Sequence, residues 1–133
     1  MTPARILRWS SGAVGVTLIV LNSLHLSVGL LRVRAALEQA AIAPRFGEPL
    51  TIAWVYIGCI NIALGILLLW LGPDLAAGSA AAWKAGLILG VALVAVGLAS
   101  YLATGKHPGL LFFSLLGLVL LVPLVTFRQH FRR

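Results

Sequence analysis

The chain has little negative charge and almost no cysteine. Its three acidic residues are Glu38, Glu48 and Asp74, and none lies inside a long apolar run. Cys59 is the only cysteine, so an intrachain disulfide and the redox chemistry of paired thiols are excluded. Because no carboxylate lies within the apolar runs, chemistry at membrane depth has to begin from amide and imidazole side chains.

Polar stripes are also missing from the four long apolar runs of the chain. The runs cover residues 12–31, 52–71, 85–103 and 109–127. About 20 helical residues at about 1.5 Å each match a hydrocarbon core of about 30 Å. Helices of a soluble bundle would carry a polar face, and these are apolar nearly all round. We therefore expect an all-α integral membrane protein in which residues 1–133 form one domain of four antiparallel transmembrane helices.

The connections between the runs predict where the helices end. Residues 32–43 are rich in helix-forming side chains, so the first helix is expected to project beyond the membrane. Residues 46–48 resemble a turn, which places Pro49 in the first turn of the second helix. Short turns at residues 72–74 and 105–109 are expected to close the remaining hairpins.

Positive charge is concentrated at the ends of the runs. The net charge is +7, without a basic cluster threaded by aromatic residues, so we expect contact with lipid headgroups and none with nucleic acid. Six cationic residues flank the runs on the side of the termini and four flank them on the other side. This excess favours a bacterial inner membrane protein with both termini on the cytoplasmic side. Trp54 is expected to be an interfacial anchor, and Glu38 and Glu48 are expected to form solvated ion pairs with Arg34 and Arg45.

Small residues share one face on three of the four predicted helices. At about 100° per residue, the glycines of each helix fall within one arc. Such faces permit close approach of helices within one chain, between protomers, or against a flat cofactor. We expect this packing to support a homo-oligomer or a larger membrane complex, and we assign it to Gly15, Gly29, Gly58, Gly65, Gly86, Gly90 and Gly97.

Three polar residues share the glycine faces of the first two helices. Asn22 and Asn61 lie near the middle of their runs, and His25 lies about one turn nearer the outer side. One interpretation is an Asn22 to Asn61 hydrogen bond that fixes helix register, with His25 as a satisfied core donor. The other is a polar pocket that opens toward the side of Tyr101. The same phase puts Cys59 opposite Asn61, where we interpret it as a small buried hydrophobe.

Every hypothesis that assigns chemistry to the membrane spans depends on His25. A neutral imidazole there is suited to be an axial ligand of haem or of a chlorophyll-type tetrapyrrole, a proton carrier, or a general acid or base. As an enzyme, the chain would be an isomerase or hydrolase of lipophilic small molecules. Asn22 and Asn61 would then orient the substrate, and Tyr101 would donate a proton.

The functional expectation that fits these features best is an interaction or scaffold subunit that contacts membrane lipid, copies of itself or other membrane subunits. It would also contact a lipid-soluble ligand or tetrapyrrole. The membrane enzyme is the first alternative and a small transporter is the second. The chain resembles the small multidrug-resistance transporters in length and in its four-span layout, but its first span lacks the glutamate on which their proton coupling depends.

Overall fold

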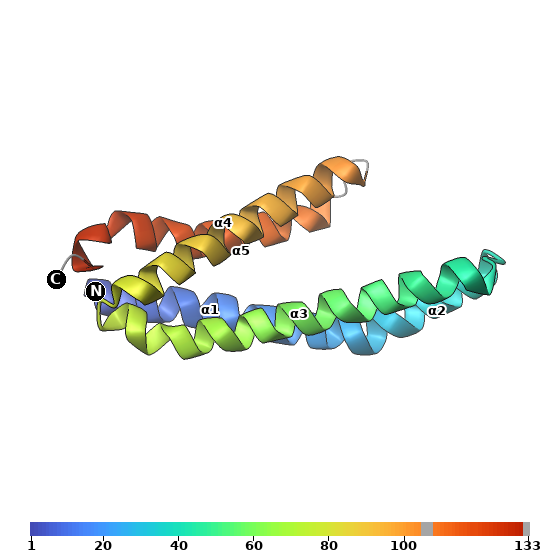
Figure 1. Cartoon of the computed structure of the whole chain (residues 1–133), viewed down its shortest axis with the longest axis horizontal. Coiled ribbons are helices and arrows are strands. Elements are labelled where there is room, and N and C mark those ends of the chain that lie inside the picture. The colour runs from blue at the N-terminus through green and yellow to red at the C-terminus, as the bar shows by residue number, and fades with distance from the viewer. Residues whose placement is uncertain (105–107, 132–133) are drawn as a thin grey trace. The chain divides into compact units, whose positions relative to one another are not determined.

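A computed structural model describes residues 1–104 and 108–131, and its regular elements in this part of the chain are all helical (Figure 1). The elements follow in the order α1 (Pro3–Leu24), the π-helix η1 (His25–Gly29), α2 (Leu30–Gln39), α3 (Pro44–Ala76), α4 (Ala80–Ala103), the 3-10 helix η2 (Pro108–Leu110), α5 (Leu111–Thr126) and the 3-10 helix η3 (Arg128–Phe131).

Four helical segments are long and apolar enough to cross a membrane, which confirms the all-α class and the number of predicted spans. The segments are Pro3–Gln39, Pro44–Ala76, Ala80–Ala103 and Pro108–Thr126. The first contains 37 residues because η1 and α2 continue α1 without a break. At about 1.5 Å per residue this exceeds the hydrocarbon thickness, in agreement with the predicted extension of the first helix.

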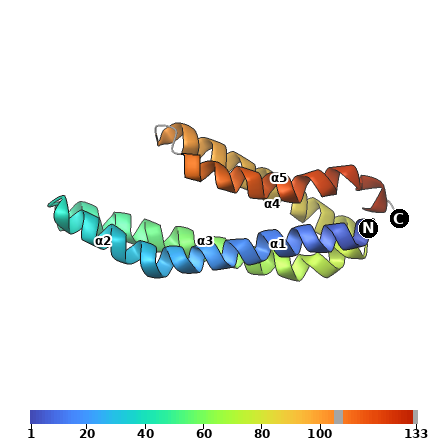
Figure 2. The ribbon, with the colours of Figure 1, turned by 180° about the vertical axis from the view of Figure 1, so that it is seen from behind.

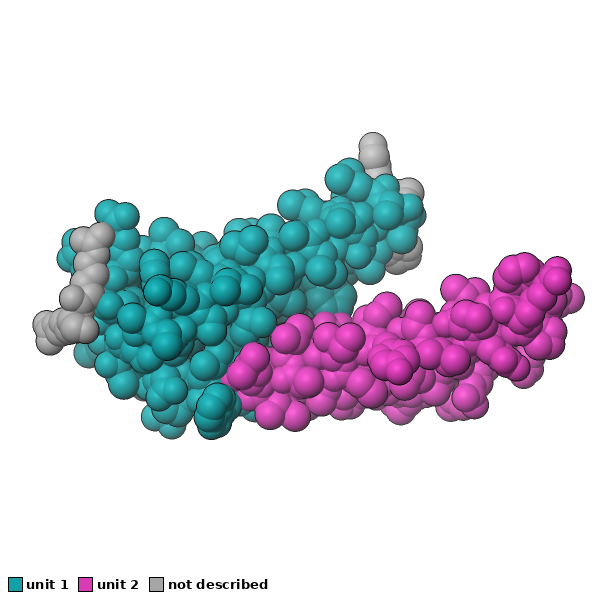
Figure 3. Space-filling view, in the orientation of Figure 1, with its two compact units in different colours: residues 1–14, 68–133 teal, residues 15–67 magenta. Residues whose placement is uncertain are grey.

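The chain divides into two compact units, which Figure 3 shows in different colours. Unit 1 contains residues 1–14 and 68–133, and unit 2 contains residues 15–67.

Unit 2 is a hairpin in which the segment from Gly15 to the end of α2 lies beside α3 and runs in the opposite direction (Figures 1 and 2). The contacts that define its register advance along one helix while they recede along the other. They join Gly15 with Gly65, Asn22 with Asn61, Leu26 with Gly58, and Leu37 with Gly47.

Unit 1 contains a second hairpin, formed by α4 and α5, whose helices also run in opposite directions. Its register is set by contacts of Gly86 with Leu124 and of Gly97 with Ser114. The Ser114 hydroxyl donates to the carbonyl oxygen of Val94 at 3.0 Å, a hydrogen bond between the two helices. Large leucines fill the core of unit 1, and Leu7, Leu68, Leu75, Leu120 and Leu124 have no exposed side-chain surface.

The predicted turn at residues 46–48 is wrong, because α3 already begins at Pro44. The chain reverses earlier, at residues 40–43, where Ala41 adopts a positive φ of 50°. Proline is well suited to the first position of a helix, where its missing N–H has no partner to lose. Pro44 therefore starts the helix, and Pro49 lies inside α3, not in its first turn.

The predicted turn at residues 72–74 is also wrong, because α3 continues to Ala76. Gly72 serves close packing instead: a Cβ there would lie 3.1 Å from the Ser11 hydroxyl. The reversal occurs at Gly78, whose φ of +82° is easily adopted only by glycine. Ser79 then caps α4, since its hydroxyl accepts a hydrogen bond from the backbone N–H of Ala82 at 3.3 Å. The third predicted turn includes residues 105–107, which lie outside the described residues.

Candidate functional site

The polar centre of unit 2 is a pair of asparagines on facing helices. Asn61 Nδ2 donates to Asn22 Oδ1 at 3.1 Å. This is the interhelical hydrogen bond that the first interpretation of these residues predicts. Asn22 Nδ2 donates in turn to the carbonyl oxygen of Leu18 at 2.8 Å. Asn22 is only 3% exposed, so these bonds hold its amide in place against α3. The hydrogen-bonded pair fixes the register of the two helices.

His25 lies one turn further along and stacks on Trp54 of α3. The two rings are nearly parallel, at 9°, with 3.9 Å between their centroids. The Trp54 indole Nε1 also donates to the backbone carbonyl of His25 at 3.1 Å. Gly29 makes room for the indole, because a Cβ there would lie 3.2 Å from Trp54 Cζ2. Trp54 is therefore a packing partner of His25 at the centre of this cluster.

The sequence predicts Trp54 only as an interfacial anchor, and this partnership with His25 is not among the expectations. A signal was present in the spacing of the contact positions on α3. Gly47, Trp54 and Asn61 recur every seven residues, as do Gly58 and Gly65. A seven-residue recurrence places side chains on the seam that faces a neighbouring helix.

A π turn at His25–Gly29 joins α1 to α2 within one continuous helical segment. A single π turn absorbs one extra residue without breaking the helix. In this turn the His25 carbonyl accepts from the N–H of Leu30, and it accepts the Trp54 indole as well.

His25 Nε2 is buried and has no hydrogen-bond partner among the described residues. A buried polar atom without a partner costs about 1–3 kcal/mol, so it is an exception in this otherwise satisfied cluster. The expectation that His25 is a donor satisfied within the core is therefore wrong for Nε2. Ligation of a tetrapyrrole by His25 stays a prediction.

The fourth predicted catalytic residue belongs to the other unit. Tyr101 lies on α4 in unit 1 and is half-buried, whereas Asn22, His25 and Asn61 lie in unit 2. Three of the four residues assigned to an enzymatic site therefore lie in one unit. Within residues 1–104 and 108–131, no group of three or more His, Cys, Asp or Glu side chains is suited to hold a metal ion.

The predicted packing glycines line the contacts between paired helices. A Cβ at Gly65 would lie 2.7 Å from the Gly15 carbonyl oxygen, and one at Gly90 would lie 2.6 Å from the Leu121 side chain. The other predicted glycines face Trp54 (Gly29), Leu26 (Gly58), Leu124 (Gly86) and Ser114 (Gly97). The matching face of α5 is not among the expectations from the sequence; there Gly117 lies against the backbone of Gly90 and Val94. Its signal was the three-residue spacing of Ser114 and Gly117.

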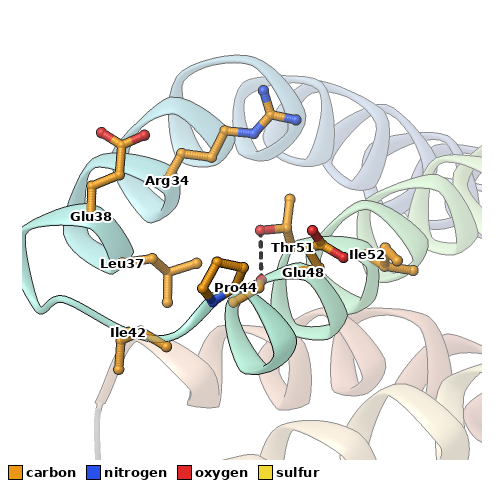
Figure 4. Close-up of a pocket in the computed structure, with 9 residues that line it drawn as sticks. Arg34, Leu37, Glu38, Ile42, Pro44, Glu48, Thr51 and Ile52 are labelled. Carbon is orange, nitrogen blue, oxygen red and sulfur yellow. Dashed lines mark hydrogen bonds between the residues drawn. The ribbon is translucent and has the colours of Figure 1, made fainter.

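A groove with charged walls lies between α2 and α3, and Figure 4 shows a close-up. It encloses about 480 Å³ and is lined by Arg34, Leu37, Glu38, Ile42, Pro44, Gly47, Glu48, Thr51 and Ile52. The ion pairs expected for these acids are not found among the described residues, and the Arg45 guanidinium lies instead 4.8 Å from the centre of the Phe46 ring.

The interpretation of Cys59 as buried is also wrong, because its side chain is exposed on the outer side of α3.

No protein-family model matches the chain, and neither curated proteins nor solved structures give a significant match.

Proposed function

We propose that the chain is a membrane interaction protein, a scaffold subunit that assembles with copies of itself or with another membrane subunit. The observation that carries this proposal is how the buried polar side chains of the spans are used. Asn22, Asn61 and Trp54 form hydrogen bonds that join the helices of unit 2, and Ser114 does so in unit 1. Trp83 Nε1 likewise donates to the carbonyl of Leu124 at 3.0 Å.

Catalysis would require some of these groups to face a cavity that admits a substrate. Four surface hollows of the described residues are lined by other side chains, and the unpartnered nitrogen of His25 is covered by protein. The arrangement therefore supports a role in helix packing more than a role in bond making or breaking.

The outer faces of the unit 2 hairpin offer a surface for association. Only 17% of the residues in the most apolar window of α3 are buried. On α1, Val16, Val20 and Leu24 repeat every four residues and are each more than half exposed. Side chains at this spacing form one continuous apolar stripe along a helix. In a bilayer such a stripe contacts lipid, or it packs against the helix of another subunit.

Cysteine cross-linking in native membranes tests this proposal. The native cysteine is first removed by Cys59→Ala, and single cysteines are then introduced by Val20→Cys on the exposed stripe or by Leu18→Cys at a buried position. We expect the cysteine at position 20 to give cross-linked dimers or a cross-link to a partner subunit, and the one at position 18 to give none. Light scattering of the unmodified protein in mild detergent should show a mass above the 14.1 kDa of one chain.

Two results would overturn the proposal. The first is a 14.1 kDa monomer in detergent together with equal, background cross-linking at both positions. The second is a visible absorbance band in a 14.1 kDa monomer that disappears in a His25→Ala variant, because a single chain that holds a tetrapyrrole would favour the membrane enzyme over the scaffold subunit.

A further inference from the structure

The groove between α2 and α3 continues along the outer side of α3 as a second hollow. Arg34, Thr51 and Ile52 line both hollows, so they mark the junction. Beyond the junction the lining is apolar, with Val55, Tyr56 and Cys59. One surface of unit 2 therefore combines a charged end near the tip of the hairpin with an apolar end within the span.

The charges at the first end come from both walls of the groove. In Figure 4, Arg34 and Glu38 project from α2, while Glu48 and Thr51 come from α3 on the opposite wall. Arg34, Glu38 and Glu48 form no ion pair with one another in the described part of the chain. The groove thus presents one cation and two anions whose hydrogen-bonding capacity is open to a ligand.

The two ends of this surface match the two sides of a membrane boundary. The apolar runs of the sequence end at Leu31 and begin again at Ile52, so Arg34 and Glu48 lie just outside the hydrocarbon core. Cys59 lies seven residues beyond Ile52, which is about 10 Å deeper along the helix. A ligand that follows the whole surface must have a charged head and an apolar tail of at least this length.

We propose that this surface binds one phospholipid with a primary-amine headgroup, of the phosphatidylethanolamine class. The Arg34 guanidinium holds the phosphate, for which its planar fork of donors is well suited. Glu38 and Glu48 accept hydrogen bonds from the ammonium group. An acyl chain lies along Ile52, Val55 and Tyr56 toward Cys59.

The balance of charge in the groove selects this headgroup over the common alternatives. One arginine and two glutamates give the lining a formal charge of −1, which disfavours a headgroup with a net negative charge such as phosphatidylglycerol. A choline headgroup is zwitterionic too, but its quaternary nitrogen has no N–H to donate to Glu38 or Glu48. A primary ammonium has three such donors. This inference is independent of the proposed scaffold role, since a monomer and an oligomer would both present the groove.

Native mass spectrometry of the full-length, delipidated protein tests the proposal. The protein is mixed with equal amounts of phosphatidylethanolamine, phosphatidylcholine and phosphatidylglycerol of identical acyl chains. We expect one phosphatidylethanolamine to remain bound per chain at activation energies that remove the other two lipids. A soluble phosphoethanolamine without acyl chains is expected to bind at least tenfold more weakly, because it lacks the apolar contacts.

Charge variants with matched controls assign the headgroup contacts. Arg34→Gln is expected to weaken retention about tenfold or more, as for a lost charge-assisted hydrogen bond, while Arg32→Gln on the same helix leaves it unchanged. The double change Glu38→Gln with Glu48→Gln is expected to shift the preference to phosphatidylglycerol, and Asp74→Asn is not. Circular dichroism verifies that each variant remains helical.

Equal retention of the three lipids by the unmodified protein would overturn the proposal. So would equal retention by the Arg34→Gln and Arg32→Gln variants, because the phosphate would then lie elsewhere. A preference for phosphatidylethanolamine that survives the double glutamate substitution would refute the assigned ammonium contacts.

Discussion

Gly117 offers a sharp test of how unit 1 is packed. A Cβ at this position would lie 2.6 Å from the Gly90 carbonyl oxygen and 2.8 Å from the Val94 backbone nitrogen. Ordinary contacts begin at 3.4 Å, so Gly117→Ala would have to separate α4 from α5 by about 0.8 Å at this point. These two obstructing atoms are backbone atoms, and a change of rotamer at Val94, whose Cγ2 would lie 2.7 Å away, cannot relieve the conflict with them.

The expected loss of stability is about 1–3 kcal/mol, the usual range for overpacking a tight contact. The separation would also strain the nearby hydrogen bond from Ser114 to Val94. The assay is reversible unfolding of the purified protein in mixed micelles with increasing dodecyl sulfate, followed by circular dichroism and by tryptophan fluorescence.

Gly12→Ala is the matched control, because nothing lies within 4 Å of a Cβ at that position. Alanine also favours a helix over glycine by up to about 1 kcal/mol. The Gly12→Ala variant should therefore unfold at the same or a higher dodecyl sulfate fraction than the unmodified protein. If Gly117→Ala proves as stable as Gly12→Ala, the close approach of α4 and α5 described above is incorrect.

Three further predictions concern the remaining contacts. In a double-mutant cycle of Asn22→Leu and Asn61→Leu, unfolding free energies should give a coupling of about 0.6 to 1.7 kcal/mol, and additive effects would mean that no hydrogen bond joins the pair. His25→Phe keeps the stack on Trp54 and removes an unpartnered nitrogen, so the same titration should show equal or greater stability; a loss above about 1 kcal/mol would reveal a partner for that nitrogen. Gly78→Ala should release η3, because its Cβ would lie 2.7 Å from a carbonyl oxygen of that segment at an unfavourable φ; unchanged trypsin resistance of the C-terminal segment would contradict this.

The sequence predicts the spans well because hydropathy and length are local properties that a bilayer imposes on every helix. It also predicts the face shared by Asn22 and Asn61, since helical phase is nearly constant before η1. The turns are predicted less well. Glycine and proline mark turns in water, but here Gly72 lies inside α3 against the Ser11 hydroxyl, and Pro49 also lies inside α3.

The stack of His25 on Trp54 joins two helices that are paired only in the folded hairpin. The seven-residue spacing on α3 indicates that Trp54 faces a neighbouring helix, but it does not indicate which residue of that helix it contacts. The exposure of Cys59 is also not predictable from one helix. Helical phase predicts the side of α3 on which Cys59 lies, but not whether another helix covers that side. Burial between helices is a property of the pair, and the hydropathy of one run does not reveal it.

The π turn at His25–Gly29 has a consequence for how this hairpin can change in evolution. An extra residue in a regular helix rotates everything beyond it by about 100°, which would turn Arg34 and Glu38 away from α3. Here the wide turn takes up that rotation within five residues, and Leu37 still meets Gly47. The two arms of the hairpin can therefore gain or lose single residues at this point without losing the alignment of their tip. Length variation among descendants of this chain is expected to concentrate at the π turn and to be rare in the α-helical segments on either side.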